Sequence, residues 1–139
     1  MLRAVIDTNV IIAGMRSTLG ASHAILLAMA ERRFTPVVSV PLVMEYEDVA
    51  KRPGMLPHLT TVQIDAILNQ ICAGAIEQRI YFSWRPFLPD PDDDMLVELA
   101  LAAQASYIVT SNLRDLHPAT QLGLRVIEPR DFLVIIESL

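Results

Sequence analysis

Short apolar runs alternate along the whole chain with longer stretches whose apolar residues recur at helical spacing. Short runs rich in Val and Ile are typical of buried strands, and i, i+3, i+4 spacing is typical of helices packed on a sheet. We therefore predict strands at residues 2–6, 37–40, 80–82, 107–110 and 124–127. We predict helices at residues 23–33, 41–51, 92–105 and 130–138, and another that begins at Thr60 or Thr61 and ends near Gly74.

This alternation favours a mostly parallel sheet with helices on both faces, which is a three-layer α/β/α sandwich. Ser22 is expected to cap the first helix, and Pro41 suits the first turn of the second. A length of 139 residues fits one domain over residues 1–139, and no repeat, low-complexity segment or linker divides it.

The composition is 53% apolar, yet no apolar run approaches the roughly 18–20 residues of a membrane span. Asp7 and Asn9 interrupt the N-terminal apolar run, which excludes a secretory signal pattern there. We expect a cytoplasmic protein with a large core and a self-interface. Cys72, the single cysteine, lies among helically spaced apolar residues and is expected to be an unpaired core thiol.

The formal net charge of −5 gives no bulk attraction to nucleic acid. A polyphosphate substrate would therefore need divalent cations to reverse the local sign of charge. The first polar cluster that could supply such a site is Asp7-Thr8-Asn9, directly after the first predicted strand. The carboxyl ends of strands in open α/β sheets are where ligands bind.

A second acidic cluster, Asp90-Pro91-Asp92-Asp93-Asp94, precedes a long predicted helix. Negative charge stabilises a helix N-terminus, but one or two carboxylates are enough for that. Four carboxylates repel one another, and no run of Lys or Arg lies nearby, so a metal ion is the alternative counter-charge. Asp93 is in register with the apolar residues Leu96, Val97 and Ala100, which directs it toward the buried face.

Two further segments could carry chemistry, and each has an ordinary structural explanation. Residues 110–116, Thr-Ser-Asn-Leu-Arg-Asp-Leu, follow a predicted strand and could orient a carboxylate or a phosphate, or could form a simple turn. Glu45 and Glu47 flank the apolar stripe of the helix at 41–51 on opposite edges. The helical wheel does not choose between these two, and a solvated acidic face explains both.

Four motifs, in their order along the chain, resemble those of the PIN-domain family. They are Ile6-Asp7-Thr8-Asn9, Ser39-Val40-Pro41 leading to Glu45, Asp90-Pro-Asp-Asp93, and Thr110-Ser-Asn112 with Asp115. Members are compact α/β nucleases, and the match is most similar to the VapC-like toxin branch of bacterial toxin–antitoxin modules. The resemblance covers essentially the whole chain and implies a PIN-like version of the sandwich above. Each motif is short, and their specificity comes from all four occurring in the right order.

The resemblance implies a role for each matching residue. Asp7 corresponds to the first-strand metal ligand, Glu45 to the helix acid, and Asp93 to the acid that opens the central helix, with Asp90 in support. Many relatives have Asp where this chain has Asn112, and others have their acid where Asp115 stands. Asp115 is therefore taken as the fourth catalytic and metal-binding residue, with Asn112 as its neutral partner.

Carboxylates without a matching His or Cys set suit hard cations, so the expected cofactor is Mg²⁺ or Mn²⁺. The implied reaction is hydrolysis of RNA phosphodiester bonds by metal-activated water. Thr8, Asn9, Thr110 and Ser111 are expected to fix carboxylate rotamers. Surface arginines that could contact phosphate are Arg16, Arg52, Arg85 and Arg114.

Two other functions compete with the ribonuclease hypothesis. One is a different metal-dependent phosphohydrolase, such as a flap-type DNA nuclease or a phosphatase. The other is a PIN-like module that binds RNA or protein without cutting, which Asn112 at the fourth acidic position keeps open. The resemblance also implies homodimerisation and a small antitoxin partner that blocks the acidic cleft.

Overall fold

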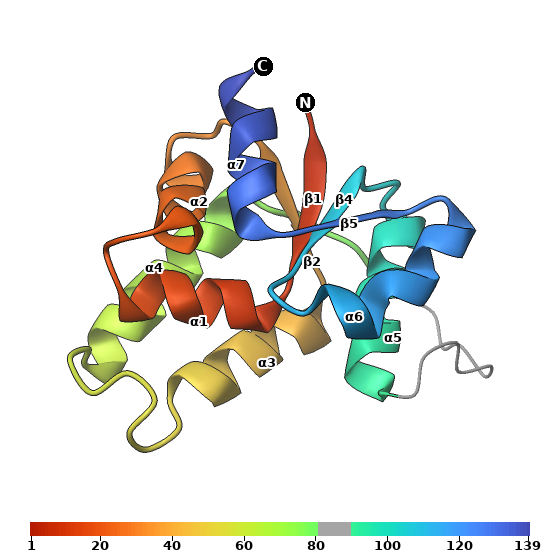
Figure 1. The fold of residues 1–139 in the computed structure, drawn as a ribbon. Coiled ribbons are helices and arrows are strands. Elements are labelled where there is room, and N and C mark those ends of the chain that lie inside the picture. The colour runs from red at the N-terminus through yellow and green to blue at the C-terminus, as the bar shows by residue number, and fades with distance from the viewer. Residues whose placement is uncertain (81–89) are drawn as a thin grey trace.

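Five parallel strands form one sheet in the order β3-β2-β1-β4-β5, in a computed structural model that describes residues 1–80 and 90–139 (Figure 1). The central strand β1 pairs in parallel with both neighbours, so that Ala4 faces Pro36 on one side and Tyr107 on the other. The strands are β1 (Arg3–Ile6), β2 (Thr35–Val38), β3 (Ile76–Glu77), β4 (Tyr107–Val109) and β5 (Arg125–Ile127).

Helices cover the sheet on both faces, which confirms the predicted three-layer α/β/α fold class. Right-handed crossovers place the helices that link β1, β2 and β3 on one face, and α5 on the other. Helices α2 and α7 pack side by side, while α5 packs on β1, β2 and β4 (Figure 1). The helices are α1 (Thr8–Arg16), α2 (Ala21–Ala30), α3 (Val40–Ala50), α4 (Thr61–Gly74), α5 (Pro91–Ala102), α6 (Leu113–Leu116), the 3₁₀ helix η1 (His117–Leu122) and α7 (Pro129–Glu137).

The core lies on both faces of β1, where Ala4, Val5 and Ile6 are at most 1% exposed. Two rings meet edge to face above the sheet, with the Phe34 and Phe132 centroids 5.1 Å apart. Burial on both faces explains why the strand continues after the exposed Arg3 as the apolar run Ala4-Val5-Ile6.

The two helices on either side of the loop after α3 begin with side-chain caps. Ser39 Oγ accepts a 3.2 Å hydrogen bond from the Leu42 amide at the start of α3. Thr60 and Gln63 form a reciprocal capping box at the start of α4, which confirms the predicted start of that helix. These caps fix where α3 and α4 leave the sheet and the loop.

The sequence prediction missed α1 and placed the start of α2 wrongly. Helix α1 begins directly after Asp7, and α2 begins at Ala21 after Gly20, whose φ is +96°. Ser22 therefore lies inside the first turn and is not the cap. The error arose because Thr8 and Asn9 resemble turn residues, while Val10, Ile11 and Met15 carry the helical spacing.

Two smaller expectations also change. The edge strand is Ile76–Glu77; Ile80 is not in a strand, and Tyr81 and Phe82 lie outside the described residues. Cys72 is free as expected, but it is exposed and not in the core, because it lies on the outer side of α4. Within the described ranges no single helix has the length and apolarity of a membrane span; α1 and α2 meet the test only jointly, with a 97° bend between them.

Candidate active site

The chain reverses its direction of travel across the sheet between β1 and β4. From β1 it moves outward through β2 and β3, and it then returns to the other side of β1 as β4 and β5. The carboxyl ends of adjacent strands separate at such a switch point and leave a crevice for ligands. Asp7 follows β1 at this point and Thr110 follows β4, so residues 103 positions apart meet here.

Thr110 holds the Asp7 carboxylate in place. Its hydroxyl is fully buried and donates a 2.8 Å hydrogen bond to Asp7 Oδ2. The same hydroxyl accepts hydrogen bonds from the Asn112 amide at 3.0 Å and from Asn9 Nδ2 at 3.4 Å. Asn9 Nδ2 also lies 3.3 Å from Asp7 Oδ2, and Asn9 Oδ1 accepts from the Ser111 amide at 3.2 Å. This network fixes the plane of the carboxylate before any ligand arrives.

Helix α3 presents Glu45 to the same crevice. The buried Tyr46 hydroxyl donates to the Ile6 carbonyl at the end of β1, which ties the helix to the central strand. Glu47 points away, because its carboxylate pairs with Lys51 at 3.0 Å. The structure therefore separates the two acids that the helical wheel left equivalent, and Glu45 is the one at the crevice.

The start of α5 supplies the acidic cluster from the opposite face of the sheet. Asp90 is the cap, and its Oδ1 accepts a 2.9 Å hydrogen bond from the Asp92 amide. Asp92 and Asp93 both line the crevice, although the sequence directed only Asp93 toward it. Asp94 is 9% exposed, a burial that the apolar stripe of α5 does not predict.

Asp115 completes the acidic lining from the short helix α6. Asn112 Nδ2 donates a 2.7 Å hydrogen bond to Asp115 Oδ2, so the neutral residue orients the acid three positions later. Six of the acids named above line one pocket with a volume of about 390 Å³, whose single basic lining residue among those described is Arg16. The acidic lining residues are Asp7, Glu45, Asp90, Asp92, Asp93 and Asp115.

Burial raises the pKa of three lining acids, Asp7, Glu45 and Asp93, and the charges of neighbouring acids add to each rise. Burial raises the pKa of Asp7, while the Thr110 hydrogen bond and the Thr8 and Asn9 amides oppose the rise. Burial, followed by the charge of Asp92, raises the pKa of Glu45. At these two positions the pocket therefore disfavours the charged form of the carboxyl group.

Asp93 shows the largest of these effects, with a pKa raised to about 6. Burial is the main cause, followed by the negative charges of Asp90 and Asp7. Carboxylates from β1, the α5 cap and α6 thus act on one another electrostatically. A divalent cation would relieve this repulsion and lower all three raised pKa values.

The donor set fits a hard divalent cation. Carboxylate, hydroxyl and amide oxygens are the ligands of Mg²⁺ and Mn²⁺, and no histidine of the described residues lines the pocket. The buried Thr8 hydroxyl lies close enough to Glu45 to lower the pKa of that carboxyl, but it makes no hydrogen bond of regular geometry within the part of the chain described, so a polar ligand there would satisfy it. In residues 1–80 and 90–139 no three Asp, Glu, His or Cys side chains converge closely enough to hold an ion as they stand. Binding of an ion would therefore require the carboxylates to move closer together.

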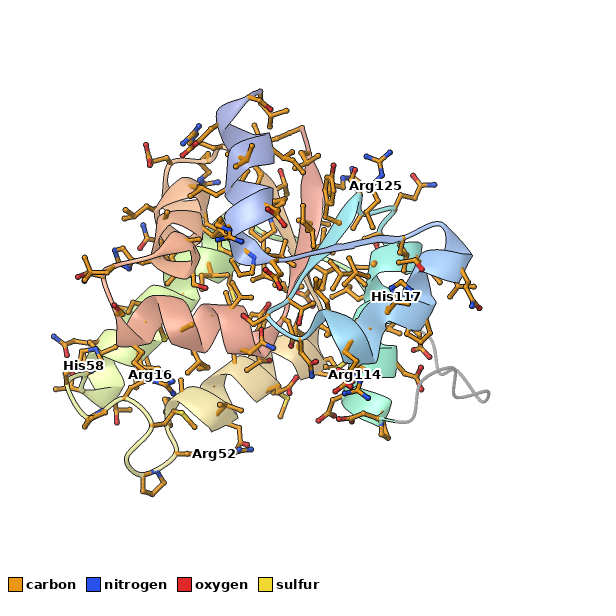
Figure 2. All side chains as sticks on the ribbon, in the orientation of Figure 1. Arg16, Arg52, His58, Arg114, His117 and Arg125 are labelled. Carbon is orange, nitrogen blue, oxygen red and sulfur yellow. The ribbon has the colours of Figure 1, made fainter. Side chains whose placement is uncertain are left out.

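The predicted phosphate contacts separate into different environments (Figure 2). Arg16 lines the pocket from the end of α1, and Arg114 lies on α6. Arg52 lies beyond the end of α3 and pairs with Asp48 at 3.0 Å. Arg85 lies outside the described residues.

Sequence reasoning missed the other wall of the pocket, which consists of Ile12, Ala13, Val49 and Met55. The signal was present: Thr8, Ile12 and Arg16 recur at i+4 on one helical face, as do Glu45 and Val49. Because α1 was not predicted, its half of this pattern could not be found. Ser111, which was expected to contribute its hydroxyl, takes part through its backbone amide.

Comparisons with known proteins agree with this architecture. The family model described as "PIN domain" matches residues 3–114. A chain in the crystal structure of VapBC2 from Rickettsia felis, bound to a DNA fragment from their promoter, superposes with a TM-score of 0.59 at 16% identity. The alignment covers 91% of this chain and 98% of that one, which shows a shared fold. No curated protein matches the sequence.

Proposed function

Because the chain belongs to the PIN-domain family, whose members are generally nucleases that use divalent metal ions, we propose that it is a Mg²⁺- or Mn²⁺-dependent endoribonuclease. The observation that carries the proposal is the pocket at the switch point, which six carboxylates of the described residues line from the end of β1, from α3, from the start of α5 and from α6. Clustered acids in a crevice with raised pKa values are typical of a functional site and costly in a purely structural one.

Asp7, Glu45 and Asp93 would hold the principal ion, and Asp115 would hold a further ion or position the attacking water. The bound ion would supply charge neutralisation for the phosphate and activation of water for in-line attack. Thr110 and Asn9 hold the Asp7 carboxylate in one orientation. Asn112 does the same for Asp115. Asp90 fixes the start of α5 and thereby the position of Asp93.

The test is incubation of the purified protein with a mixed single-stranded RNA pool in Mn²⁺, in Mg²⁺ and in EDTA. RNA should be cut only with metal. Asp7→Asn and Glu45→Gln should lose at least about a hundredfold in rate, because each removes a ligand. Glu47→Gln is the matched control, since Glu47 lies on the same helix but pairs with Lys51.

Parallel arms separate the rival functions. The same pool made as DNA, a DNA flap substrate and an aryl phosphate report on DNA nucleases and phosphatases. Cleavage of those substrates without RNA cleavage would contradict the proposal in favour of another phosphohydrolase. Metal-independent binding of RNA without any cleavage would favour a non-catalytic module.

We further propose that the protein is a cytoplasmic toxin, that it forms a homodimer, and that a small antitoxin inhibits it. The shared fold with a VapBC2 chain supports this setting. So do the exposed apolar side chains Val40 and Met44, at 56% and 64%, because such surface is commonly covered by a partner. Light scattering of the purified chain and growth arrest on its expression, relieved by a gene encoded beside it, would test these points.

A further inference from the structure

The site pocket has two ends of different chemistry. The inner end, at the edge of the sheet, is acidic, and the outer end is bounded by Ile12, Ala13, Val49 and Met55. Ile12 is a core residue at 5% exposure, whereas Val49 and Met55 are half-buried and present surface to the pocket. Ion binding by the acids does not use this apolar end.

Helices α1 and α3 contribute to both ends of the pocket through side chains spaced four residues apart. They begin at the carboxyl edge of the sheet, after β1 and β2, and pack against each other. Along α1 the pocket-facing side chains run from Thr8 to Ile12 to Arg16, a length of roughly 12 Å at 1.5 Å per residue. Along α3, Glu45 is followed one turn later by Val49. From the sheet outward, the pocket therefore presents oxygen ligands, then an apolar wall, and then the guanidinium of Arg16.

Met55 closes the outer end and fixes the arginine there. It lies in the loop after α3, where its amide donates to the Arg52 carbonyl at 3.0 Å. Its sulfur accepts a 3.0 Å hydrogen bond from Arg16 Nη2. A thioether is polarizable and packs well on aromatic rings, and a guanidinium can bind phosphate or stack on a base.

We propose that the apolar end is a nucleobase subsite, which accepts one unstacked base beside the scissile phosphate and directs the following phosphate to Arg16. This inference rests on the proposed ribonuclease function and deepens it, because it gives Val49 and Met55 a role in binding a base of the substrate. The scissile phosphate would be bound at the inner, acidic end through the divalent cation. The attached base would then lie against Val49 and Met55. A pocket of about 390 Å³ is within the range of small-ligand sites. A base inside a duplex would first have to be unstacked.

The experiment uses abasic RNA. Fragments from a random single-stranded pool, cut by the wild type in Mn²⁺, identify one cleaved sequence, which is resynthesised with an abasic ribose at each position in turn. One abasic position next to the cut should lower kcat/KM about tenfold or more, since the burial of the base against Val49 and Met55 is lost. The same sequence in a full duplex should be cut more slowly by a similar factor.

Met55→Ala tests whether the subsite is responsible. It should cut the intact RNA more slowly and should no longer distinguish it from the critical abasic RNA, while its Mg²⁺-induced rise in Tm stays as in the wild type. Val62→Ala is the matched control, because Val62 is 77% exposed and outside the pocket. Val49→Ala provides the same test if Met55→Ala does not fold.

The outcomes separate this inference from the function on which it rests. If the wild type cuts no RNA, the proposed function fails and the subsite fails with it. If the wild type cuts every abasic RNA as fast as the parent, or if both pocket variants keep the discrimination, the ribonuclease stands and the base subsite is overturned.

Discussion

Thr110 Oγ1 lies 2.8 Å from Asp7 Oδ2, and this hydrogen bond joins the carboxyl ends of β4 and β1 across the switch point of the sheet. The Thr110 hydroxyl donates its proton to Asp7 and accepts hydrogen bonds from Asn112 and Asn9. One buried side chain thus links the first strand, the first turn of α1 and the loop after β4. The geometry of the acidic pocket depends on it.

Thr110→Val should therefore impair the site without removing any charge. We expect Mg²⁺ affinity or kcat to fall about 10- to 100-fold, the range typical for a residue that orients a ligand. Metal-dependent cleavage and the Mg²⁺-induced Tm shift measure the two effects. Thr18→Val, at an exposed position, is the control, and Thr110→Ser should keep most activity. Equal loss in the Ser and Val variants would contradict a role for the hydroxyl.

The fold was largely predictable because α/β alternation is recorded in the period of the apolar residues. The buried part of β1 is the short apolar run Ala4-Val5-Ile6, and the capping box of Thr60 and Gln63 marks α4 without any tertiary information. Helix α1 was not predicted, because Asp7 both follows the last residue of the strand and directly precedes the helix. A residue used twice in this way gives no separate boundary signal.

The site was predictable only in part, for two physical reasons. The wheel could not separate Glu45 from Glu47, since the difference between them is the Lys51 partner of Glu47, which depends on side-chain packing. The apolar wall of Val49 and Met55 requires knowing that α1 lies beside α3, and only the tertiary structure brings them together. Motifs indicate ligands better than they indicate surfaces.

The raised pKa of Asp93, about 6, predicts a pH-dependent stability difference without metal. The pKa of this acid is higher in the folded state than in the unfolded state, where it is about 4. Its ionisation therefore destabilises the fold as the pH rises from about 4 toward the pKa of the folded state. Asp93→Asn cannot ionise and escapes this loss. Its Tm in EDTA should therefore equal that of the wild type near the lower pH and exceed it by about 2–5 °C at neutral pH.

Thermal denaturation between these pH values, with and without Mg²⁺, checks this prediction. Mg²⁺ should raise the Tm of the wild type more than that of Asp93→Asn, because the ion relieves repulsion that the variant lacks. Glu47→Gln should follow the wild type throughout. A constant Tm difference at all pH values would mean that the ionisation of Asp93 is not involved.

The pair of Asn112 and Asp115 predicts the effect of restoring an acid at the fourth position. Asn112→Asp would place a carboxylate where an amide now lies 2.7 Å from Asp115 Oδ2, so the donor would become a like charge. We expect a lower Tm in EDTA and a larger Mg²⁺-induced rise than in the wild type. Asp115→Asn should instead lose about 10- to 100-fold in activity. Unchanged metal response in both variants would remove Asp115 from the ion site.

Arg16 provides the last prediction, because it is the one basic side chain among the described residues lining the acidic pocket. If Arg16 contacts one RNA phosphate, Arg16→Gln should lower the slope of log affinity against log salt by about 0.7 in magnitude, the value for one contact with a single strand. Arg52→Gln is the matched control, since Arg52 pairs with Asp48 outside the pocket. Fluorescence anisotropy of a labelled single-stranded RNA in Ca²⁺, with Asp7→Asn as the common background, measures affinity without cleavage. Equal slopes for Arg16→Gln and its parent would show that the arginine contacts no phosphate and acts only on Met55, its partner at 3.0 Å.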